Sequence, residues 1–333
     1  MAATDNRGPT LIADIGGTNA RFAFWDDEKQ QPTAVDSVSC EAFDNIADAI
    51  EQYLATCGMA APTEASIALA ATLEGDRVTL TNGPWSFSSD TLRHRLGLDR
   101  LLILNDFTAL AMSLPYLSDD ELLQIGGTTP DIHGVKGIIG PGTGLGVSGL
   151  IAAGSGLWIP LEGEGGHVTY GPVASNEMAI IDRLQQRFGH VSAERIVSGQ
   201  GLENIYQALT EINGETPNRL PADEISRRGI AKLCPLCHES LTFFCAALGT
   251  VAGNLALTLG AQGGVYIGGG IPPKLGRFFL ESPFRERFER HGRFTGYLEQ
   301  IPCYLIDTPY PALTGAAQAL VADLPGVGHR FTG

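Results

Sequence analysis

The feature that most constrains the fold is a strand, a two-glycine turn and a second strand near the N-terminus, with no helix between them. It reads Leu11-Ile-Ala-Asp14-Ile-Gly16-Gly17-Thr18-Asn19-Ala-Arg21-Phe-Ala-Phe24. Glycines lack Cβ, so the turn can adopt left-handed dihedrals that bring N–H groups close to an anion, and Thr18 and Asn19 add donors. The Asp14 carboxylate suits a phosphate that arrives with Mg²⁺, so the turn indicates a nucleotide site. An ordinary Gly-Gly hairpin turn explains this loop alone equally well.

Composition and charge narrow the class of protein. The chain has 333 residues, 44% of them hydrophobic and 18% charged, which is typical of a globular protein with room for two domains. The formal net charge of −15 and the lack of a Lys/Arg stripe oppose nucleic-acid binding. The first residues lack the apolar segment of a signal peptide, and polar residues interrupt the most apolar helix candidate, residues 241–259. We therefore expect a cytoplasmic protein with no membrane partner and with reduced cysteines.

Alternating strand and helix patterns predict an α/β fold. Strands are predicted at residues 11–15, 20–25, 65–71, 77–81, 101–104, 137–139, 147–151, 158–161, 265–267 and 304–306. Helices are predicted at residues 45–57, 89–96, 107–114, 176–188, 202–212, 224–233, 241–259, 283–291 and 313–321. A further helix is expected to open at a capping box formed by Ser118 and Glu121.

Two more segments carry polar groups at strand ends. Asn105 and Asp106 directly follow the buried strand 101–104, where α/β folds place active sites. A second glycine-rich loop reads Gly140-Pro-Gly142-Thr143-Gly144-Leu-Gly146. Its glycine spacing differs from the dinucleotide-binding fingerprint, and it runs into a strand instead of a helix. We interpret it as a second hairpin that faces the first across a cleft and binds phosphate.

Three further motifs can each be interpreted either as a ligand-binding site or as ordinary local structure without a ligand. Glu164 and His167 lie among three glycines, which suits hydrogen bonds to sugar hydroxyls better than a metal site, although a surface loop without a role would look similar. Glu194 adds a carboxylate in a turn-rich segment, or simply starts a helix. A strand ends in Gly268-Gly269-Gly270, where the backbone can lie flat against a purine or form a tight turn.

Taken together, the motifs resemble the bacterial hexokinase-fold glucokinases, the ATP:glucose phosphotransferases of the sugar kinase/Hsp70/actin group. The first loop, the Asn105-Asp106 segment, the second loop, the Glu164/His167 and Glu194 segments and the triple glycine match that family's motifs in the same order. The resemblance implies a two-domain actin-like/hexokinase (ribonuclease H-like) fold with a cleft between the domains. The small domain would contain residues 1–115 plus 307–333, and the large domain residues 116–306.

The resemblance also implies roles for individual residues and a pair of cofactors, ATP and Mg²⁺. Asp106 would be the catalytic base, and glucose would be bound by Asn105, Asp106, Glu164, His167 and Glu194. ATP would be bound by Asp14, Gly16, Gly17, Thr18, Asn19, Gly142, Thr143, Gly144, Gly268, Gly269 and Gly270. Asp14 would hold the metal through water, and the family resemblance implies a homodimer.

Three other functions stay open from the sequence. A non-catalytic sugar sensor could keep the same fold and bind glucose. A hexokinase of broader sugar specificity would keep every motif. An actin- or Hsp70-like ATPase would keep both phosphate loops, but it would not need Glu164, His167 and Glu194 to be clustered for hydroxyls.

Overall fold

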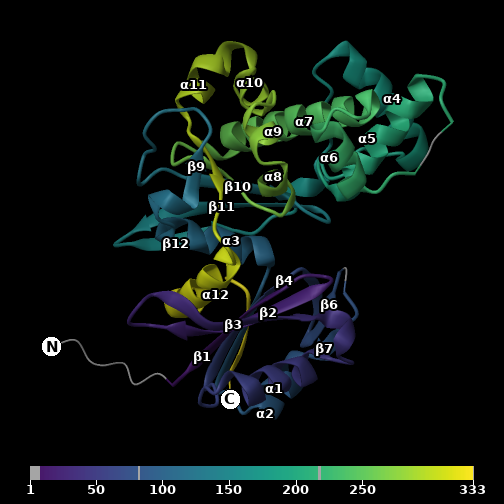
Figure 1. Ribbon diagram of the computed structural model, residues 1–333. Coiled ribbons are helices and arrows are strands. Elements are labelled where there is room, and N and C mark those ends of the chain that lie inside the picture. Colours follow the sequence, from purple (N-terminus) through teal and green to yellow (C-terminus); the bar gives the residue numbers. More distant parts are fainter. Residues whose placement is uncertain (1–7, 82, 217–218, 333) are drawn as a thin grey trace. The chain divides into compact units, whose positions relative to one another are not determined.

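The computed structural model describes residues 8–332 except residues 82, 217 and 218, and the chain forms two compact units (Figure 1). Unit 1 contains the described residues up to Leu117, residues 153–162 and the residues from Thr308 on. Unit 2 contains residues 118–152 and 163–307. The domain boundaries given above stay a prediction. Residues 1–7, in which the sequence analysis found no signal-peptide segment, lie outside the described residues.

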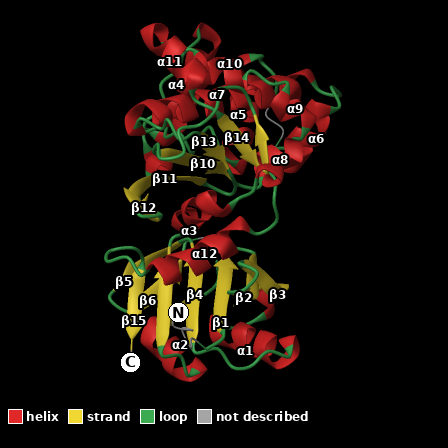
Figure 2. Ribbon diagram, turned by 90° about the vertical axis from the view of Figure 1, so that its left-hand side faces the viewer, coloured by secondary structure: helices red, strands yellow, loops and turns green. Residues whose placement is uncertain are grey.

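Unit 1 is built on a six-stranded sheet of order β15-β8-β4-β1-β2-β3. Its strands are β1 (Thr10–Ile15), β2 (Asn19–Asp26), β3 (Gln31–Ser39), β4 (Glu64–Leu69), β8 (Arg100–Leu104) and β15 (His329–Thr332). Successive side chains of a strand point to opposite faces, so Leu11 packs in one core cluster and Ile12 in another. Figure 2 shows helices α1 (Ile46–Cys57) and α2 (Ser89–Leu96) on one face of this sheet and α12 (Pro311–Ala322) on the other. Both faces are therefore covered.

The helices of unit 1 begin and end at local signals. They are α1 (Ile46–Cys57), α2 (Ser89–Leu96), α3 (Asp106–Ser113) and α12 (Pro311–Ala322). Asn45 caps α1 by accepting the N–H of Asp48, and left-handed Gly58 ends the helix. Helix α12 packs against α3 so closely that a Cβ on Gly315 would lie 1.6 Å from the carbonyl oxygen of Ala109. This contact fixes the helix whose first residue is Asp106.

A second six-stranded sheet has the order β12-β11-β10-β13-β14-β9. Its strands are β9 (Leu122–Gln124), β10 (Lys136–Pro141), β11 (Leu145–Gly154), β12 (Leu157–Leu161), β13 (Val265–Ile267) and β14 (Cys303–Ile306). Strands β10, β13 and β14 are parallel, whereas β11 and β9 run antiparallel to their neighbours β10 and β14. The carboxyl ends of β10 and β13 therefore lie at one edge, where the second loop and the triple glycine begin.

The helices of unit 2 surround one long helix, α7 (Pro235–Leu259), which packs against α5, α6 and α10. The others are α4 (Ser175–Phe188), α5 (Gly199–Ile212), α6 (Ala222–Ile230), α8 (Ile271–Leu275), α9 (Arg277–Leu280), α10 (Phe284–Glu289) and α11 (Thr295–Gln300). By length and composition α7 is the one helix of the described chain that could cross a membrane, but 72% of its most apolar window is buried inside the protein. Its buried apolar residues belong to the main core cluster of unit 2, to which the neighbouring helices and strands also contribute.

The remaining elements are short. A three-stranded sheet in unit 1 contains β5 (Ala71–Glu74), β6 (Arg77–Leu80) and β7 (Ser86–Ser88). The 3₁₀ turns are η1 (Cys40–Ala42), η2 (Leu114–Tyr116), η3 (Asp119–Glu121), η4 (Gly165–His167) and η5 (Gly292–Phe294).

The α/β prediction is confirmed, and most strands and helices lie within a few residues of their predicted positions. The helix expected after Ser118 is wrong. The Glu121 carboxylate does accept the N–H and the hydroxyl of Ser118, at 2.9 and 2.8 Å. The chain then makes only the turn η3 and enters β9, because Leu122 pairs with Ile306 of β14. Strand β3 was not predicted, since its residues are mostly exposed and show no clear apolar alternation.

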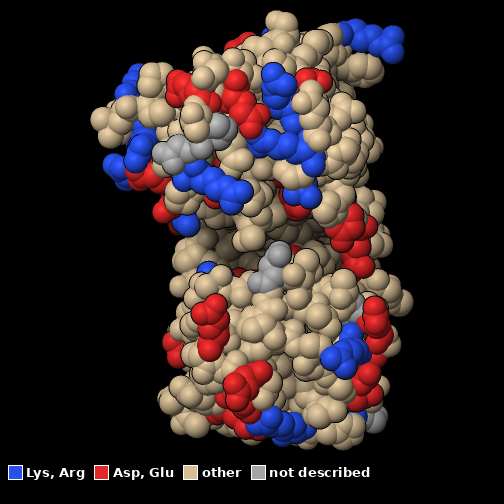
Figure 3. Space-filling model, turned by 90° about the vertical axis from the view of Figure 1, so that its right-hand side faces the viewer, with Lys and Arg blue, Asp and Glu red and all other residues tan. Residues whose placement is uncertain are grey.

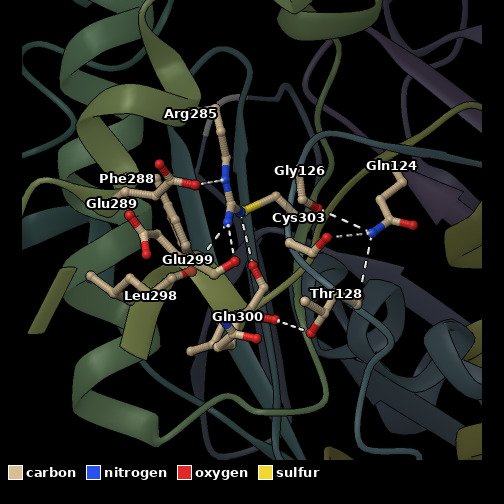
Figure 4. A network of polar contacts seen from close by, with 12 residues as sticks. Gln124, Gly126, Thr128, Arg285, Phe288, Glu289, Leu298, Glu299, Gln300 and Cys303 are labelled. Carbon is tan, nitrogen blue, oxygen red and sulfur yellow. Dashed lines mark hydrogen bonds and ion pairs between the residues drawn. The ribbon is translucent and has the colours of Figure 1, made fainter. Parts of the chain in front are cut away.

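Arg285 of α10 fastens the connection between α11 and β14 (Figure 4). Its guanidinium donates to the Glu289 carboxylate at 2.6 Å and to the carbonyl oxygens of Leu298 and Ile301 at 3.1 and 2.8 Å. The neighbouring turn is held by Thr128, whose hydroxyl donates to the Gln300 carbonyl at 2.8 Å. One guanidinium thus donates to several carbonyl groups at and just after the end of α11.

Charge is distributed unevenly on the face seen in Figure 3. Lys and Arg side chains gather there on unit 2, whereas acidic side chains are spread over much of unit 1. The net charge of −15 therefore does not make the surface uniformly negative.

Candidate functional site

The first loop of unit 1 is a tight hairpin between β1 and β2. Asp14 pairs with Arg21 and Ile15 with Ala20, and the N–H of Gly16 donates to the Asn19 carbonyl at 3.0 Å. Neither Gly16 nor Gly17 is among the described residues with positive φ, so these two glycines do not use the left-handed dihedrals that are open to them. The strand–turn–strand prediction is confirmed.

The side chains at the tip of this loop are exposed to solvent, but its backbone is hydrogen-bonded to the residue that follows β3. The side chains of Thr18 and Asn19 are exposed. The N–H of Cys40 donates to the Thr18 carbonyl at 2.8 Å, which ties the tip to the end of β3. A fixed loop with exposed polar side chains is suited to contact a charged ligand.

Asp14 is mostly buried beside the loop and is paired with Arg21. The Arg21 Nη1 lies 3.0 Å from Asp14 Oδ2, and the guanidinium also lies 5.5 Å from the centre of the Tyr310 ring. Burial raises the pKa of the Asp14 carboxyl, and the charge and hydrogen bond of Arg21 offset only part of that rise. Burial destabilises the ionised form of this carboxyl group, and a further cation nearby would stabilise that form.

Asn105 and Asp106 lie where β8 ends and α3 begins. Asn105 is the N-cap of α3, and its Oδ1 accepts the N–H groups of Phe107 and Thr108 at 2.8 and 3.1 Å. Asp106 Oδ1 accepts the N–H of Phe107 at 2.9 Å. The capping bonds occupy the amide oxygen of Asn105, so its Nδ2 is the group suited to donate to a hydroxyl. The Asp106 carboxylate is half-buried and oriented by the helix start.

The second glycine-rich loop of the chain lies in unit 2. It is the hairpin Gly142-Thr143-Gly144 between β10 and β11, as predicted. The N–H of Gly142 donates to the Gly144 carbonyl at 2.8 Å, and the N–H of Gly199 donates to the Gly142 carbonyl at 2.9 Å. The loop is therefore tied to the first turn of α5, and Thr143 at its tip is exposed.

The residues that the resemblance assigns to sugar binding in unit 2 belong to two segments that lie beside the same loop. Glu164 directly precedes the turn η4, and His167 is its last residue. Their carboxylate and imidazole lie 3.9 Å apart, and their side chains are 86% and 62% exposed. The N–H of Glu194 donates to the Gly166 carbonyl at 2.9 Å, so the two segments lie side by side. The Glu194 carboxylate accepts the N–H of Leu145 at 2.9 Å.

The triple glycine lies at the carboxyl end of β13, next to the end of β10. The N–H of Gly268 donates to the Ile139 carbonyl at 2.9 Å. Gly269 has a φ of +76°, and a Cβ there would lie 2.4 Å from the carbonyl oxygen of Pro141. Position 269 therefore requires glycine because of both its backbone conformation and this close approach.

The sequence reasoning missed the partners of two site residues. The Asp14–Arg21 pair could have been found, because a four-residue turn at residues 16–19 places these positions opposite each other. The contact of Glu194 with Leu145 joins residues 49 positions apart, and no local pattern indicates it.

Within the described residues, no group of three or more His, Cys, Asp or Glu is placed to hold a metal ion. Mg²⁺ does not need such a group, because it keeps several waters and binds through one or two carboxylates plus substrate phosphates. A single carboxylate with a pKa raised by burial, Asp14, fits that kind of binding.

Comparison with known proteins decides the family. The family model named Glucokinase matches residues 11–323. The chain belongs to the glucokinase family. A glucokinase of Aromatoleum aromaticum is 53% identical over 319 residues, covering 96% of each chain.

Solved structures of glucokinases share the fold. A glucokinase from an Antarctic psychrotroph has a TM-score of 0.84 and 34% identity, covering 94% of this chain and 99% of that one. A ROK family glucokinase from Streptomyces griseus, in complex with glucose and AMPPNP, has a TM-score of 0.62 and 19% identity, covering 93% and 98%. The hexokinase-type fold that the resemblance implied is thereby confirmed.

Proposed function

We propose that this chain transfers the γ-phosphoryl group of ATP to the 6-hydroxyl of glucose, with Asp106 as the general base. The match of the glucokinase family model to residues 11–323 carries the proposal. The Streptomyces griseus glucokinase was crystallised with glucose and AMPPNP, an ATP analogue, which supports ATP as the donor. The proposed reaction class is phosphoryl transfer, in which positioning and charge stabilisation supply most of the catalysis.

Asp106 is proposed to act where its carboxylate is already oriented. It accepts the proton of the 6-hydroxyl while the hydroxyl oxygen bonds to the γ-phosphorus and the bond from that phosphorus to the leaving ADP oxygen breaks. The N–H of Phe107 donates to Asp106 Oδ1 at 2.9 Å and so helps to orient the carboxylate. Such a positioned base contributes about 10²–10⁴-fold to the rate.

The remaining sugar contacts are proposed for Asn105, Glu164, His167 and Glu194. Carboxylates accept hydrogen bonds from hydroxyls, whereas Asn Nδ2 donates and a neutral imidazole does both. The exposed side chains of Glu164 and His167 are accessible to a ligand. Tolerance of mannose or fructose is a separate question, which a panel of sugars answers.

The two hairpin loops are proposed to hold the phosphates of ATP, and the triple glycine to lie against the adenosine. The exposed Thr18, Asn19 and Thr143 supply side-chain donors, and loop N–H groups supply the rest. Asp14 would hold Mg²⁺ through water, and the metal would supply charge neutralisation on the phosphates. A cytoplasmic homodimer is part of the same proposal, and light scattering of the purified protein tests the oligomeric state.

The substitution Asp106→Asn tests the base directly. It keeps the size and most hydrogen bonds of the side chain but removes its ability to take a proton. We expect kcat to fall about 10²–10⁴-fold while glucose affinity changes much less, as measured by a coupled assay of glucose 6-phosphate and by calorimetric glucose titration. Near-normal turnover in this variant would remove Asp106 from the role of base.

The same assay separates the other functions. A sugar sensor would bind glucose and form no glucose 6-phosphate. An actin- or Hsp70-like ATPase would consume ATP without glucose, whereas a kinase consumes it in proportion to sugar phosphorylated.

A further inference from the structure

The Glu194 side chain lies against the second phosphate loop instead of standing apart from it. Its Oε2 accepts the N–H of Leu145, the residue directly after the loop, at 2.9 Å. A Cβ on Gly144 would lie 2.5 Å from the same oxygen, so the carboxylate can take this position only because residue 144 is glycine. One proposed sugar ligand is thus in direct contact with a proposed nucleotide loop.

Hydrogen bonds fix the backbone of Glu194, so its carboxylate can hold the second phosphate loop in place. Its N–H donates to the Gly166 carbonyl at 2.9 Å, and its own carbonyl accepts the hydroxyl of Ser198 at 2.8 Å. The loop itself has one internal bond, from Gly142 to Gly144, and one bond from Gly199 at its first residue. At the other end of the loop, the Glu194 carboxylate is a charged acceptor for the N–H of Leu145. Charge-assisted hydrogen bonds are roughly twice as strong as neutral ones.

The position of this charge has a cost. A carboxylate next to a loop that receives a triphosphate repels the ligand unless donors share its charge. The N–H of Leu145 does so on Oε2. A sugar hydroxyl donating to the carboxylate would share more of the charge, and it would thereby favour the nucleotide.

We propose that Glu194 is a positioning residue for the second phosphate loop as well as a sugar ligand, and that it couples glucose binding to nucleotide binding through one carboxylate. This inference rests on the proposed function for the identity of the two ligands. It concerns residues of unit 2 alone: Gly144, Leu145 and Glu194.

Binding of magnesium AMPPNP in the absence of any sugar tests the positioning role. Without glucose, a residue that acts only on the sugar cannot change nucleotide affinity. We expect Glu194→Ala to weaken nucleotide binding about tenfold, the order expected from a lost hydrogen bond to a charged group. Glu194→Gln keeps an acceptor for the N–H of Leu145, so we expect its affinity to stay within about threefold of the parent protein.

Two further variants make the test specific. Glu164→Ala is the matched control, because Glu164 is an exposed carboxylate of the same proposed sugar set and lies 3.9 Å from the His167 imidazole. It should weaken glucose binding and leave nucleotide affinity without sugar unchanged. Gly144→Ala should displace the Glu194 carboxylate and weaken nucleotide binding like Glu194→Ala, which keeps the test decisive if Glu194→Ala does not fold.

Coupling is read from the same titrations with glucose present. In the parent protein glucose should tighten nucleotide binding, and this effect should shrink toward none in Glu194→Ala. The inference is overturned if Glu194→Ala and Gly144→Ala bind the nucleotide without sugar as tightly as the parent protein, or more tightly. Failure of the proposed function would look different, since the parent protein would then form no glucose 6-phosphate.

Discussion

At the scale of single residues, Asp14 shows how a residue of a proposed ligand site can lower the stability of the fold. Its carboxyl is buried beside the first loop, and burial raises its pKa despite the neighbouring Arg21. The folded-state pKa thus lies above the unfolded value of about 3.9. The folded chain therefore loses stability from this group as the pH rises above that value, and the loss is complete above the folded-state pKa.

Asp14→Asn should therefore make the nucleotide-free protein more heat-stable at neutral pH and less active. We expect a higher unfolding temperature by scanning fluorimetry, together with a roughly 10²-fold lower kcat/KM for ATP if the carboxylate supports Mg²⁺. Arg21→Lys is the control, because it keeps the countercharge and leaves Asp14 in place. A variant with full activity and a lower unfolding temperature would contradict this account of Asp14.

How much of the site the sequence predicts depends on how local each contact is. The Asn105-Asp106 pair and both hairpin loops follow from adjacent residues, since a buried strand followed by glycines or caps is a local pattern. The contact of Glu194 with Leu145 depends on the packing of η4 and the α5 start against β11, which no local signal encodes.

At the scale of elements, the packing of α12 on α3 positions the segment that contains the proposed base, Asp106. Gly315 lets the two helices approach until a Cβ would lie 1.6 Å from the Ala109 carbonyl oxygen. Helix α3 starts at Asp106, so a shift of α3 moves the proposed base.

Gly315→Ala should destabilise the protein and slow catalysis together. We expect the free energy of unfolding to fall by about 1–3 kcal/mol or more from overpacking, with a loss of kcat that exceeds the change in KM. Gly296→Ala is the matched control, because Gly296 also lies in a helix but has open space around its Cβ position. It should be neutral or stabilising by up to about 1 kcal/mol. If Gly315→Ala and Gly296→Ala had equal effects in urea unfolding and in steady-state kinetics, the close approach at Gly315 would be unimportant.

Sequence patterns predicted elements well where burial is periodic and failed where pairing is distant. Helix α2 has both a Ser88 cap and a left-handed Gly97, and its predicted bounds agree with the structure. The segment after Ser118 has an equally good start signal, but it forms a strand because it pairs with β14, which is distant in sequence: Leu122 pairs with Ile306. Strand β3 is mostly exposed, and an exposed strand has no apolar face to reveal it.

At the scale of the whole molecule, a buried ion pair joins distant parts of unit 2. The Arg287 guanidinium of α10 donates to the Glu177 carboxylate of α4 and, at 2.7 Å, to the Thr250 hydroxyl of α7. Burial alone would raise the pKa of Glu177, but the hydrogen bonds and charge of Arg287, with the N–H of Val173, hold it below its ordinary value.

This pair should make the fold sensitive to acid. A depressed carboxyl pKa contributes stability above the unfolded value of about 4.3, and that stability is lost as the pH falls through the folded-state pKa. Glu177→Ala should cost about 3–5 kcal/mol at pH 7, because it leaves a buried guanidinium unpaired, and progressively less as the pH falls below about 4.3 and through the lowered folded-state pKa. Urea unfolding over a series of pH values measures this decline. The double variant Glu177→Leu with Arg287→Met should recover much of the loss, and a cost independent of pH would exclude the charge as its cause.

The measurement that tests the central claim most directly is the formation of glucose 6-phosphate by the purified chain from glucose and magnesium ATP, followed together with ADP release. The account predicts one glucose 6-phosphate per ADP, no comparable ATP consumption without glucose, and a rate that falls about 10²–10⁴-fold in Asp106→Asn. Glucose binding without product, or ATP consumption that does not depend on glucose, would contradict it.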